Sequence, residues 1–421
     1  MAALRVSGTV QVPGDKSISH RALMLSALAD GVSSVRGILR SADVESTASV
    51  LRSLGVRIPA LSEEMRIEGV GFSGMRSPSG DLNCGNSGTT TRLMTGIVSG
   101  QKIRARFTGD ESLSRRPMKR IAEPLTQMGA QFEFENEEGL PMTVTGARLQ
   151  PIDWNTKAAS AQTKSAILLA ALVSGIDVKV RESARSRDHT ERMLASLGAN
   201  VRVNDTTVHV SATARINALD VNVPGDPSSA AFFIALATLA GGGELSLPRV
   251  CVNATRGGFI SALRRMGASI RLDDLASESG EDIATLRVQP ATLHPLQIVA
   301  AEVPSIIDEL PMLACLAAAA GVELEIRGAS ELRVKESDRI RTVVDNLERI
   351  GATVEERADG LVVREGRRKL SGKVVTRGDH RIAMAFGVIG KVPGNDIQLD
   401  DRDCVAISYP SFWEDLDGAT A

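Results

Sequence analysis

The sequence predicts an α/β protein of two domains, in which strands and amphipathic helices surround buried, parallel helices. Three observations predict this class: helix-ending glycines recur at regular distances, the two halves of the chain open with matching segments, and two kinds of helix alternate. A length of 421 residues with 43% hydrophobic composition can form two domains with substantial cores. The 24% of charged residues excludes general disorder.

Two sets of glycines mark an internal repeat. The first set follows amphipathic helices and precedes alternating strands, with spacings of 74, 69, 69 and 84 residues: Gly55, Gly129, Gly198, Gly267 and Gly351. A left-handed glycine commonly ends a helix in this way. The second set ends apolar helices: Gly31, Gly100, Gly175, Gly242, Gly321 and Gly390. We therefore expect six βαβαββ-like units, three in each domain.

Matching segments open the two halves of the chain. Val12-Pro13-Gly14-Asp15 recurs 211 residues later as Val223-Pro224-Gly225-Asp226. Proline–glycine pairs favour turns between elements. The sequence thus predicts one domain over residues 14–224 and a discontinuous domain over 1–13 and 225–421, with hinges near 12–15 and 223–226 and the active site in the cleft between the domains.

The two kinds of helix differ in their apolar pattern. Residues 166–173 and 228–237 are apolar on all sides, which predicts burial of the whole helix. Residues 338–347 have one polar face, which predicts a half-exposed helix. The short segment 411–416 is expected to be the last helix of the sixth unit.

Basic residues lie at the predicted starts of the helices. Lys16, Arg21 and Arg381 begin apolar helices, where a cation opposes the helix dipole unless an anion is bound there. Arg116 and Arg339 stand at the starts of amphipathic helices. If the units are alike, these cations line one cleft, which indicates small ligands that carry several negative charges.

Composition excludes several other classes. A net charge of −2 and 3% aromatic residues argue against nucleic-acid binding. No apolar run is long enough to span a bilayer, and the N-terminus has no signal-peptide pattern. Four scattered cysteines and five scattered histidines form no metal-binding or disulfide pattern. We expect a cytoplasmic protein that needs no metal or cofactor and binds neither membrane nor nucleic acid.

Three motifs in these regions resemble the successive signatures of the 5-enolpyruvylshikimate-3-phosphate synthase family of enolpyruvyl transferases. They are Lys16-Ser17-Ile18-Ser19-His20-Arg21, Gly85-Asn86-Ser87-Gly88-Thr89-Thr90-Thr91-Arg92 and Arg333-Val334-Lys335-Glu336-Ser337-Asp338-Arg339. Asp379-His380-Arg381 fits the family's C-terminal block. The resemblance implies an inside-out α/β prism, a monomer, and a glyphosate target. It also implies transfer of the carboxyvinyl group of phosphoenolpyruvate to the 5-hydroxyl of shikimate 3-phosphate, with release of phosphate.

The resemblance also implies roles for individual residues. Shikimate 3-phosphate would be bound by Lys16, Ser17, Arg21, Ser160, Ala161 (through its backbone), Gln162, Arg187, Asp308 and Lys335. Phosphoenolpyruvate would be bound by Lys16, Gly88, Arg116, Gln162, Arg339 and Arg381. Asp308 would accept the proton of the 5-hydroxyl, Glu336 would deliver and remove the methyl proton, and Lys16 would assist. The arginine forks suit the phosphate and carboxylate groups of both substrates.

The sequence departs from the family pattern at Ala161, Glu331 and Ile407, where serine, asparagine and lysine are common. Ile407 argues for low glyphosate sensitivity and Gly88 against it, so sensitivity is left open.

Two alternatives remain beside this interpretation. The first is transfer of the same group to a UDP-amino sugar, which the Lys16-Ser17 pair and a cysteine-free loop 109–117 oppose. The second is a non-catalytic anion-binding module, in which Asp308 and Glu336 would serve no purpose.

Several polar residues have more ordinary interpretations. His20 is expected to be structural, and Arg92 is either a ligand or the buried partner of a carboxylate. Asp43 and the pair Asp110-Glu111 are expected to be solvated or to cap helices.

Overall fold

The computed structural model describes residues 4–366 and 369–420, and these divide into two compact units. The first, here the N-half unit, comprises Gly14–Val223 together with Glu278–Glu281. The second, the C-half unit, comprises Met1–Pro13, Pro224–Ser277 and Asp282–Ala421. The sequence gives no sign that residues 278–281, the turn of a hairpin, belong with the first half of the chain.

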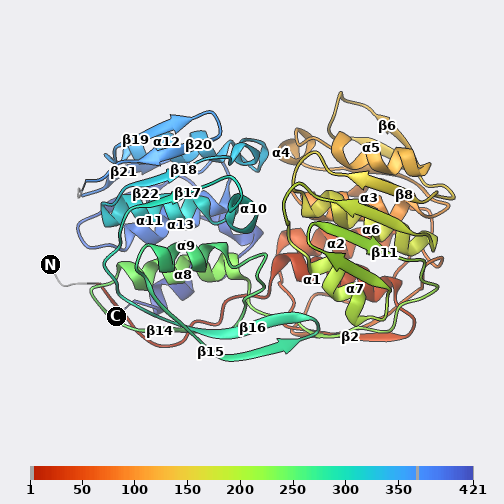
Figure 1. Cartoon of the computed structure of the whole chain (residues 1–421), viewed down its shortest axis with the longest axis horizontal. Helices are drawn as coiled ribbons and strands as arrows, with labels where there is room; N and C mark the ends of the chain where they lie inside the picture. Colours follow the sequence, from red (N-terminus) through yellow and green to blue (C-terminus); the bar gives the residue numbers. More distant parts are fainter. Residues whose placement is uncertain (1–3, 367–368, 421) are drawn as a thin grey trace. The chain divides into compact units, whose positions relative to one another are not determined.

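The core of the N-half unit is built from apolar helices. They are α1 (Lys16–Leu28), α3 (Gly88–Ser99) and α6 (Ala161–Ser174). Every residue of α6 from Thr163 to Val173 is buried, which explains the apolar pattern on all of its sides. Helix α3 contacts both α1 and α6 (Figure 1).

Amphipathic helices and short sheets surround this core. The helices are α2 (Ala42–Ser53), α4 (Glu111–Ser114), α5 (Lys119–Met128) and α7 (His189–Ser196). The strands are β2 (Val32–Arg36), β3 (Glu64–Glu68), β4 (Leu82–Asn83), β5 (Arg104–Thr108), β6 (Gln131–Phe134), β7 (Met142–Thr145), β8 (Ile152–Asn155), β9 (Val178–Arg181), β10 (Val201–Asn204), β11 (Thr207–Val210) and β12 (Asp220–Asn222). They form sheets of order β12-β2-β3, β4-β5-β7-β6 and β10-β11-β9-β8.

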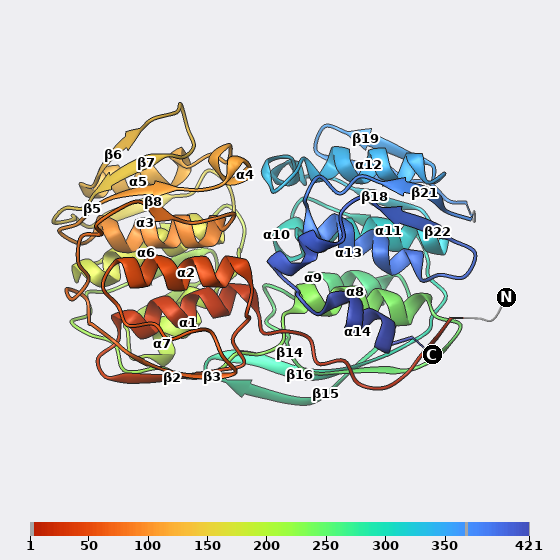
Figure 2. The same cartoon turned by 180° about the vertical axis from the view of Figure 1, so that it is seen from behind.

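The C-half unit repeats this plan. Its buried helices are α8 (Pro227–Leu239), α11 (Leu310–Ala320) and α13 (His380–Gly390), each of which contacts the other two (Figure 2). The remaining helices are α9 (Gly258–Arg265), α10 (Val303–Ile306), α12 (Arg339–Arg349) and α14 (Phe412–Gly418), with 3₁₀ turns η1 (Ser330–Val334) and η2 (Asp403–Ile407). Helix α14 begins one residue later than the expected segment 411–416, with Ser411 at its N-cap, and extends two residues further.

The strands of the C-half unit form four small sheets. They are β1 (Arg5–Val6), β13 (Gly242–Gly243), β14 (Leu245–Cys251), β15 (Ser269–Glu278), β16 (Glu281–Gln289), β17 (Leu296–Ile298), β18 (Leu324–Ile326), β19 (Val354–Arg357), β20 (Gly360–Val363), β21 (Ser371–Val374) and β22 (Asp396–Leu399). The sheet orders are β1-β13, β14-β16-β15, β17-β18-β20-β19 and β21-β22.

Strand register shows the repeat directly. In β4-β5-β7-β6 the first pair is parallel and the next two pairs are antiparallel. The β8-β9-β11-β10 and β17-β18-β20-β19 sheets have the same pattern. One unit is therefore strand, buried helix, strand, amphipathic helix and two strands. The predicted α/β class with βαβαββ units is confirmed.

The glycines that follow the amphipathic helices have the expected conformation. Their φ angles are 89°, 117°, 87°, 98° and 95° at Gly55, Gly129, Gly198, Gly267 and Gly351. The second set is mixed, because Gly31, Gly175 and Gly321 have positive φ whereas Gly100 ends α3 at −87°. Within the described part of the chain, no helix is long and apolar enough to cross a membrane.

Gly96 allows α3 and α6 to pack closely. A Cβ atom at Gly96 would lie 2.3 Å from the carbonyl oxygen of Ala166 on α6. We therefore predict that Gly96→Ala lowers the free energy of unfolding by about 1–3 kcal/mol through overpacking. Gly80→Ala is the control, because a Cβ there meets no atom within 4 Å. Equal urea-unfolding free energies for the two variants would contradict this account of the helix contact.

Candidate active site

The buried helices of the N-half unit begin beside one another. Asp15, Ser87 and Ser160 are the N-caps of α1, α3 and α6, and each side chain accepts a backbone N–H of the first turn. The Gln162 amide nitrogen at the start of α6 donates to the Thr89 hydroxyl at the start of α3, at 3.0 Å. The positive ends of these helix dipoles therefore lie together, an arrangement that favours a bound anion.

Arg21 is a buried cation held by neutral oxygens. Its Nε donates to the Thr190 hydroxyl at 2.7 Å, one Nη to the Ser165 hydroxyl at 2.8 Å, and the other to the Ser17 carbonyl at 2.9 Å. Among residues 4–366 and 369–420, no carboxylate lies within ion-pair distance of its guanidinium. Burial lowers the pKa of Arg21 to about 10, so the group is still charged at pH 7.

Lys16 is the first residue of α1, next to the cap. Its Nζ lies 3.0 Å from an oxygen of Asp43, and the Lys16 side chain is 17% exposed. The expectation that Asp43 is solvated or a cap is wrong, because this residue on α2 is buried and pairs with Lys16. Asp110, in contrast, caps α4 as expected.

Gly88 lies where two arginines converge. A Cβ at Gly88 would lie 3.0 Å from Nη1 of Arg92 and 3.5 Å from Nη1 of Arg116. Arg92 donates to the Gln162 side-chain oxygen at 2.6 Å, and Arg116 donates to the Asn86 side-chain oxygen at 2.8 Å. Because Gly88 has no side chain, the space at the N-terminus of α3 stays open. This space lies next to the guanidinium groups of Arg92 and Arg116.

The other predicted residues of this unit lie close by. Ser160 and Ala161 are the cap and first residue of α6, so the Ala161 backbone is part of the helix N-terminus. Arg187 is half-buried in the loop before α7, and its positive charge acts on Arg21. The structure thus brings together, in one unit, the predicted residues Lys16, Ser17, Arg21, Gly88, Arg116, Ser160, Ala161, Gln162 and Arg187.

The C-half unit contains a carboxylate surrounded by cations. Asp308, in the turn between α10 and α11, has one oxygen 3.2 Å from Arg339 and 3.5 Å from the Lys335 ammonium. Its other oxygen lies 3.8 Å from Arg381, which also donates to the Asp308 backbone carbonyl at 3.3 Å. Three cations therefore surround one carboxylate at the start of α11.

Arg339 joins this carboxylate to two others. Its guanidinium donates to Asp379 at 2.8 and 3.2 Å and lies 2.6 Å from Glu336. Burial alone would lower the pKa of Arg339, but Asp379 and Glu336 outweigh it and raise the pKa. The two arginines therefore differ: Arg339 has carboxylate partners, whereas Arg21 has neutral ones.

Glu336 lies two residues after η1, next to Lys335. Its side chain is 18% exposed, and one of its oxygens lies 2.6 Å from the Arg339 guanidinium. The C-half unit thus brings together the predicted residues Asp308, Lys335, Glu336, Arg339 and Arg381. The roles of individual residues stay predictions at this point.

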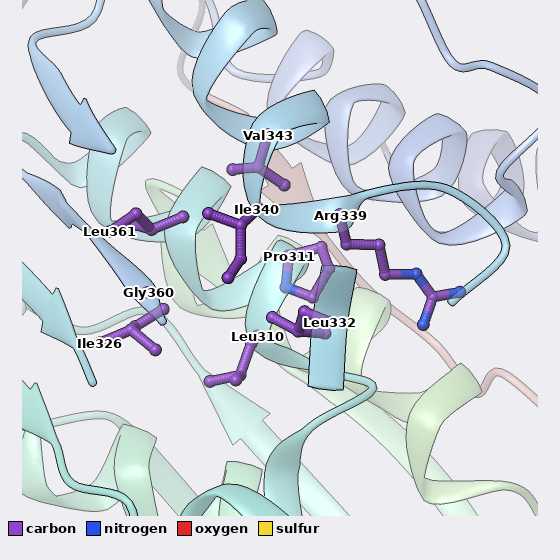
Figure 3. Close-up of a pocket in the computed structure, with 9 residues that line it drawn as sticks. All are labelled: Leu310, Pro311, Ile326, Leu332, Arg339, Ile340, Val343, Gly360 and Leu361. Atoms are coloured by element: carbon purple, nitrogen blue, oxygen red, sulfur yellow. The ribbon is translucent and has the colours of Figure 1, made fainter. Parts of the chain in front are cut away.

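A small cavity beside Arg339 is a different feature (Figure 3). It is lined by Leu310, Pro311, Ile326, Leu332, Arg339, Ile340, Val343, Gly360 and Leu361, and the Arg339 guanidinium points away from the other side chains. Because its lining is apolar, the cavity does not suit a ligand that carries phosphate and carboxylate groups.

Sequence reasoning missed several polar residues of the two clusters. Asp43 and Asp379 hold predicted cations, and Ser165 and Thr190 hold Arg21. Asp379 stood in a quoted motif but was given no role, and the signal for Ser165 was a polar residue in an otherwise apolar helix. Within the described ranges, no group of His, Cys, Asp and Glu side chains is arranged to hold a metal ion.

Comparison with known proteins decides the family. Residues 2–416 match the family model of EPSP synthase (3-phosphoshikimate 1-carboxyvinyltransferase). The chain belongs to the EPSP synthase family. The predictions of the family, its activity in the shikimate pathway and its two-domain inside-out α/β fold are confirmed.

Related EPSP synthases match along the whole chain. The 3-phosphoshikimate 1-carboxyvinyltransferases of Sulfurihydrogenibium sp. and Gloeobacter violaceus are 45% and 46% identical, over 98% of this chain and 97% and 96% of theirs. A solved EPSP synthase from Acinetobacter baumannii is 38% identical with a TM-score of 0.88, covering 99% of this chain and 96% of that one. These matches favour shikimate 3-phosphate over the UDP-amino-sugar alternative.

His20 lies within the first signature motif, but its surroundings in the structure are those of a buried structural residue. It is fully buried, its Nδ1 lies 2.7 Å from the Thr47 hydroxyl, and burial together with Lys16 and Arg21 holds its pKa well below 6.5. His20 is therefore neutral at pH 7, where it carries no proton to donate as an imidazolium.

We predict that His20 makes stability pH-dependent. Below about pH 6.5 the unfolded chain takes up a proton that folded His20 does not, so the free energy of unfolding falls as pH falls through this window, by at most about 1.4 kcal/mol per pH unit. Urea unfolding of the native chain and of His20→Asn at pH 7.5 and 5.5 measures this. The native chain should lose more stability than the variant; an equal loss would contradict the assignment.

Proposed function

We propose that the two residue clusters catalyse one addition–elimination reaction. The 5-hydroxyl of shikimate 3-phosphate adds to C2 of phosphoenolpyruvate while C3 takes up a proton to become a methyl group. Loss of a methyl proton and of phosphate then restores the double bond and gives 5-enolpyruvylshikimate 3-phosphate. This sequence needs a base, an acid and anion-binding groups, but no covalent nucleophile.

The single observation that carries the proposal is the setting of Arg21. A cation that is 4% exposed and has no carboxylate partner among the described residues is costly to bury unless an anion completes it. The nearby helix N-termini add to the positive potential. We assign Arg21, with Lys16, Ser17, Ser160, Ala161, Gln162, Arg187 and Lys335, to shikimate 3-phosphate, which has a phosphate and a carboxylate.

The second set of cations is assigned to phosphoenolpyruvate. Arg116 lies beside Gly88, where the absence of a side chain leaves room for a phosphate or carboxylate. We assign Lys16, Gly88, Arg116, Gln162, Arg339 and Arg381 to this substrate. Bidentate guanidinium groups match both of its anionic groups.

Two carboxylates supply the acid–base chemistry. Asp308, which lies next to Lys335, Arg339 and Arg381, is the proposed base for the 5-hydroxyl. Glu336 is the proposed group that protonates and later deprotonates the methyl carbon, and Lys16 assists proton transfer. These carboxylates also argue against a plain anion-binding module, since negative charges in that position weaken anion binding.

The proposal extends to the setting of the protein. We expect a monomer that works in the cytoplasm on small molecules and binds neither nucleic acid nor membrane. The net charge of −2 and the local, rather than global, concentration of cations support this.

A phosphate-release assay tests the proposed function. The chain, phosphoenolpyruvate and one acceptor are combined, and phosphate is measured. Shikimate 3-phosphate should support steady release, whereas UDP-N-acetylglucosamine and a buffer blank should not. Release with the UDP sugar alone would overturn the substrate assignment, and no release with either acceptor would overturn the catalytic function.

We predict that Glu336→Gln lowers kcat by about 10²- to 10⁴-fold, because the amide cannot exchange the methyl proton. Calorimetry should still detect shikimate 3-phosphate binding, since the binding groups remain. Glu348→Gln, an exposed change on α12, is the control and should keep the native kcat. Turnover of Glu336→Gln at the native rate would remove this residue from its role.

A further inference from the structure

Two hydroxyl groups determine how Arg21 is oriented. The Thr190 oxygen accepts from Nε and the Ser165 oxygen accepts from one Nη. Both hydroxyls therefore bind the same edge of the guanidinium group. The two hydroxyls also lie 2.7 Å apart and bond to each other. All three residues are at most 4% exposed. The guanidinium is therefore fixed by a rigid pair of acceptors.

Neutral acceptors have a consequence that carboxylates would not have. A carboxylate at this position would cancel much of the charge of Arg21 and would compete with an anionic ligand for the same N–H groups. A hydroxyl fixes the side chain and leaves its charge in place. Arg339 shows the contrast within the same chain, because its N–H groups are engaged by Asp379 and Asp308.

An ion pair next to the hydroxyls holds their helices together. Lys164 precedes Ser165 on α6, and Glu191 follows Thr190 on α7. The Lys164 ammonium lies 2.7 Å from Glu191 and 2.6 Å from Glu182, and all three side chains are 2–3% exposed. The two helices are thus joined at adjacent positions, once by the hydroxyl pair and once by the ion pair.

Lys164 also determines which cation Glu191 contacts. Of the carboxylates that act electrostatically on Arg21, Glu191 has the largest effect, although it is not in ion-pair contact. Burial would lower the pKa of Lys164, but Glu191 and Glu182 outweigh it and raise the pKa, which keeps the ammonium charged between them. Glu191 thus contacts Lys164, 2.7 Å away, and not the guanidinium of Arg21.

We propose that Ser165 and Thr190, braced by the Lys164–Glu191 ion pair, are positioning residues that orient Arg21 toward shikimate 3-phosphate while leaving its charge available to that substrate. The proposal rests on the proposed function of Arg21. It adds four residues that do not touch substrate but set its affinity through one that does.

The first test is Thr190→Val, which keeps the side-chain shape and removes the acceptor for Nε. We expect the Kd for shikimate 3-phosphate, measured by calorimetry, and its KM to rise about tenfold. The kcat and the KM for phosphoenolpyruvate should stay within about threefold, because only one substrate depends on Arg21. Ser165→Ala is the second variant, with the same expected pattern.

Matched controls separate positioning from loss of stability. Thr95→Val and Ser99→Ala make the same chemical changes at buried hydroxyls of α3 that bond only backbone carbonyls of their own helix. These controls should bind shikimate 3-phosphate like the native chain. If Thr190→Val and Ser165→Ala behave like their controls, the proposal is overturned.

A double-mutant cycle identifies the route of the effect. If Thr190 acts through Arg21, Thr190→Val should change the Kd less than twofold in an Arg21→Lys background. A full tenfold loss in that background would overturn the proposal even if Arg21→Lys alone weakens binding. If the native chain does not bind shikimate 3-phosphate at all, the proposed function has failed instead.

The ion pair has its own test. Lys164→Met should raise the Kd for shikimate 3-phosphate more than Thr190→Val does, because Glu191 is then released toward Arg21. Adding Glu191→Gln should restore the Kd to within about threefold of the native value. Failure of this second change to restore binding in a folded variant would overturn the role assigned to the pair.

Discussion

A guanidinium cation buried among neutral oxygens is the constraint on which the N-half unit depends. Arg21 reaches the ends of α1, α6 and α7 at once, through Ser17, Ser165 and Thr190. Hydrogen bonds to neutral groups satisfy its donors only in part and do not offset the cost of desolvating its charge. An anionic ligand would balance this charge, and under the proposed function Arg21 links the packing of the helices to the binding of shikimate 3-phosphate.

The C-half unit also buries an arginine, but it surrounds this cation with carboxylates. Arg339 is buried with its charge balanced by Asp379, Asp308 and Glu336. This network is internally compensated, which suits groups that exchange protons and must keep defined charges. The two buried arginines thus differ, because Arg21 has only neutral hydrogen-bond partners among the described residues, whereas Arg339 lies among three carboxylates.

Much of the fold could be predicted from the sequence, because glycines and apolar segments recur at regular spacings and mark the repeat. The glycines after the amphipathic helices, such as Gly129, adopt the left-handed conformation that their position demands. The turn at 278–281 could not be foreseen, since its grouping with the N-half unit depends on tertiary contacts such as that of Glu281 with His189, not on local pattern.

The candidate site could be predicted only in part, from positively charged residues at the starts of helices, where a cation is unusual. Lys16 and Arg381 stand out because they oppose the helix dipole. Asp43 was misjudged because nothing in a single sequence distinguishes a buried partner from a solvated carboxylate. The sequence did not reveal Thr190 for a related reason, since the role proposed for it depends on a hydrogen bond from Arg21, 169 residues away in the chain.

The most direct measurement of the central claim is a crystal structure of the chain with shikimate 3-phosphate bound. The account predicts a phosphate or carboxylate oxygen of the ligand about 2.7–3.2 Å from the Arg21 guanidinium, with the bonds of Arg21 to Ser165 and Thr190 unchanged. A ligand bound with Arg21 facing only protein or water would contradict the claim that this cation is kept unpaired for the substrate.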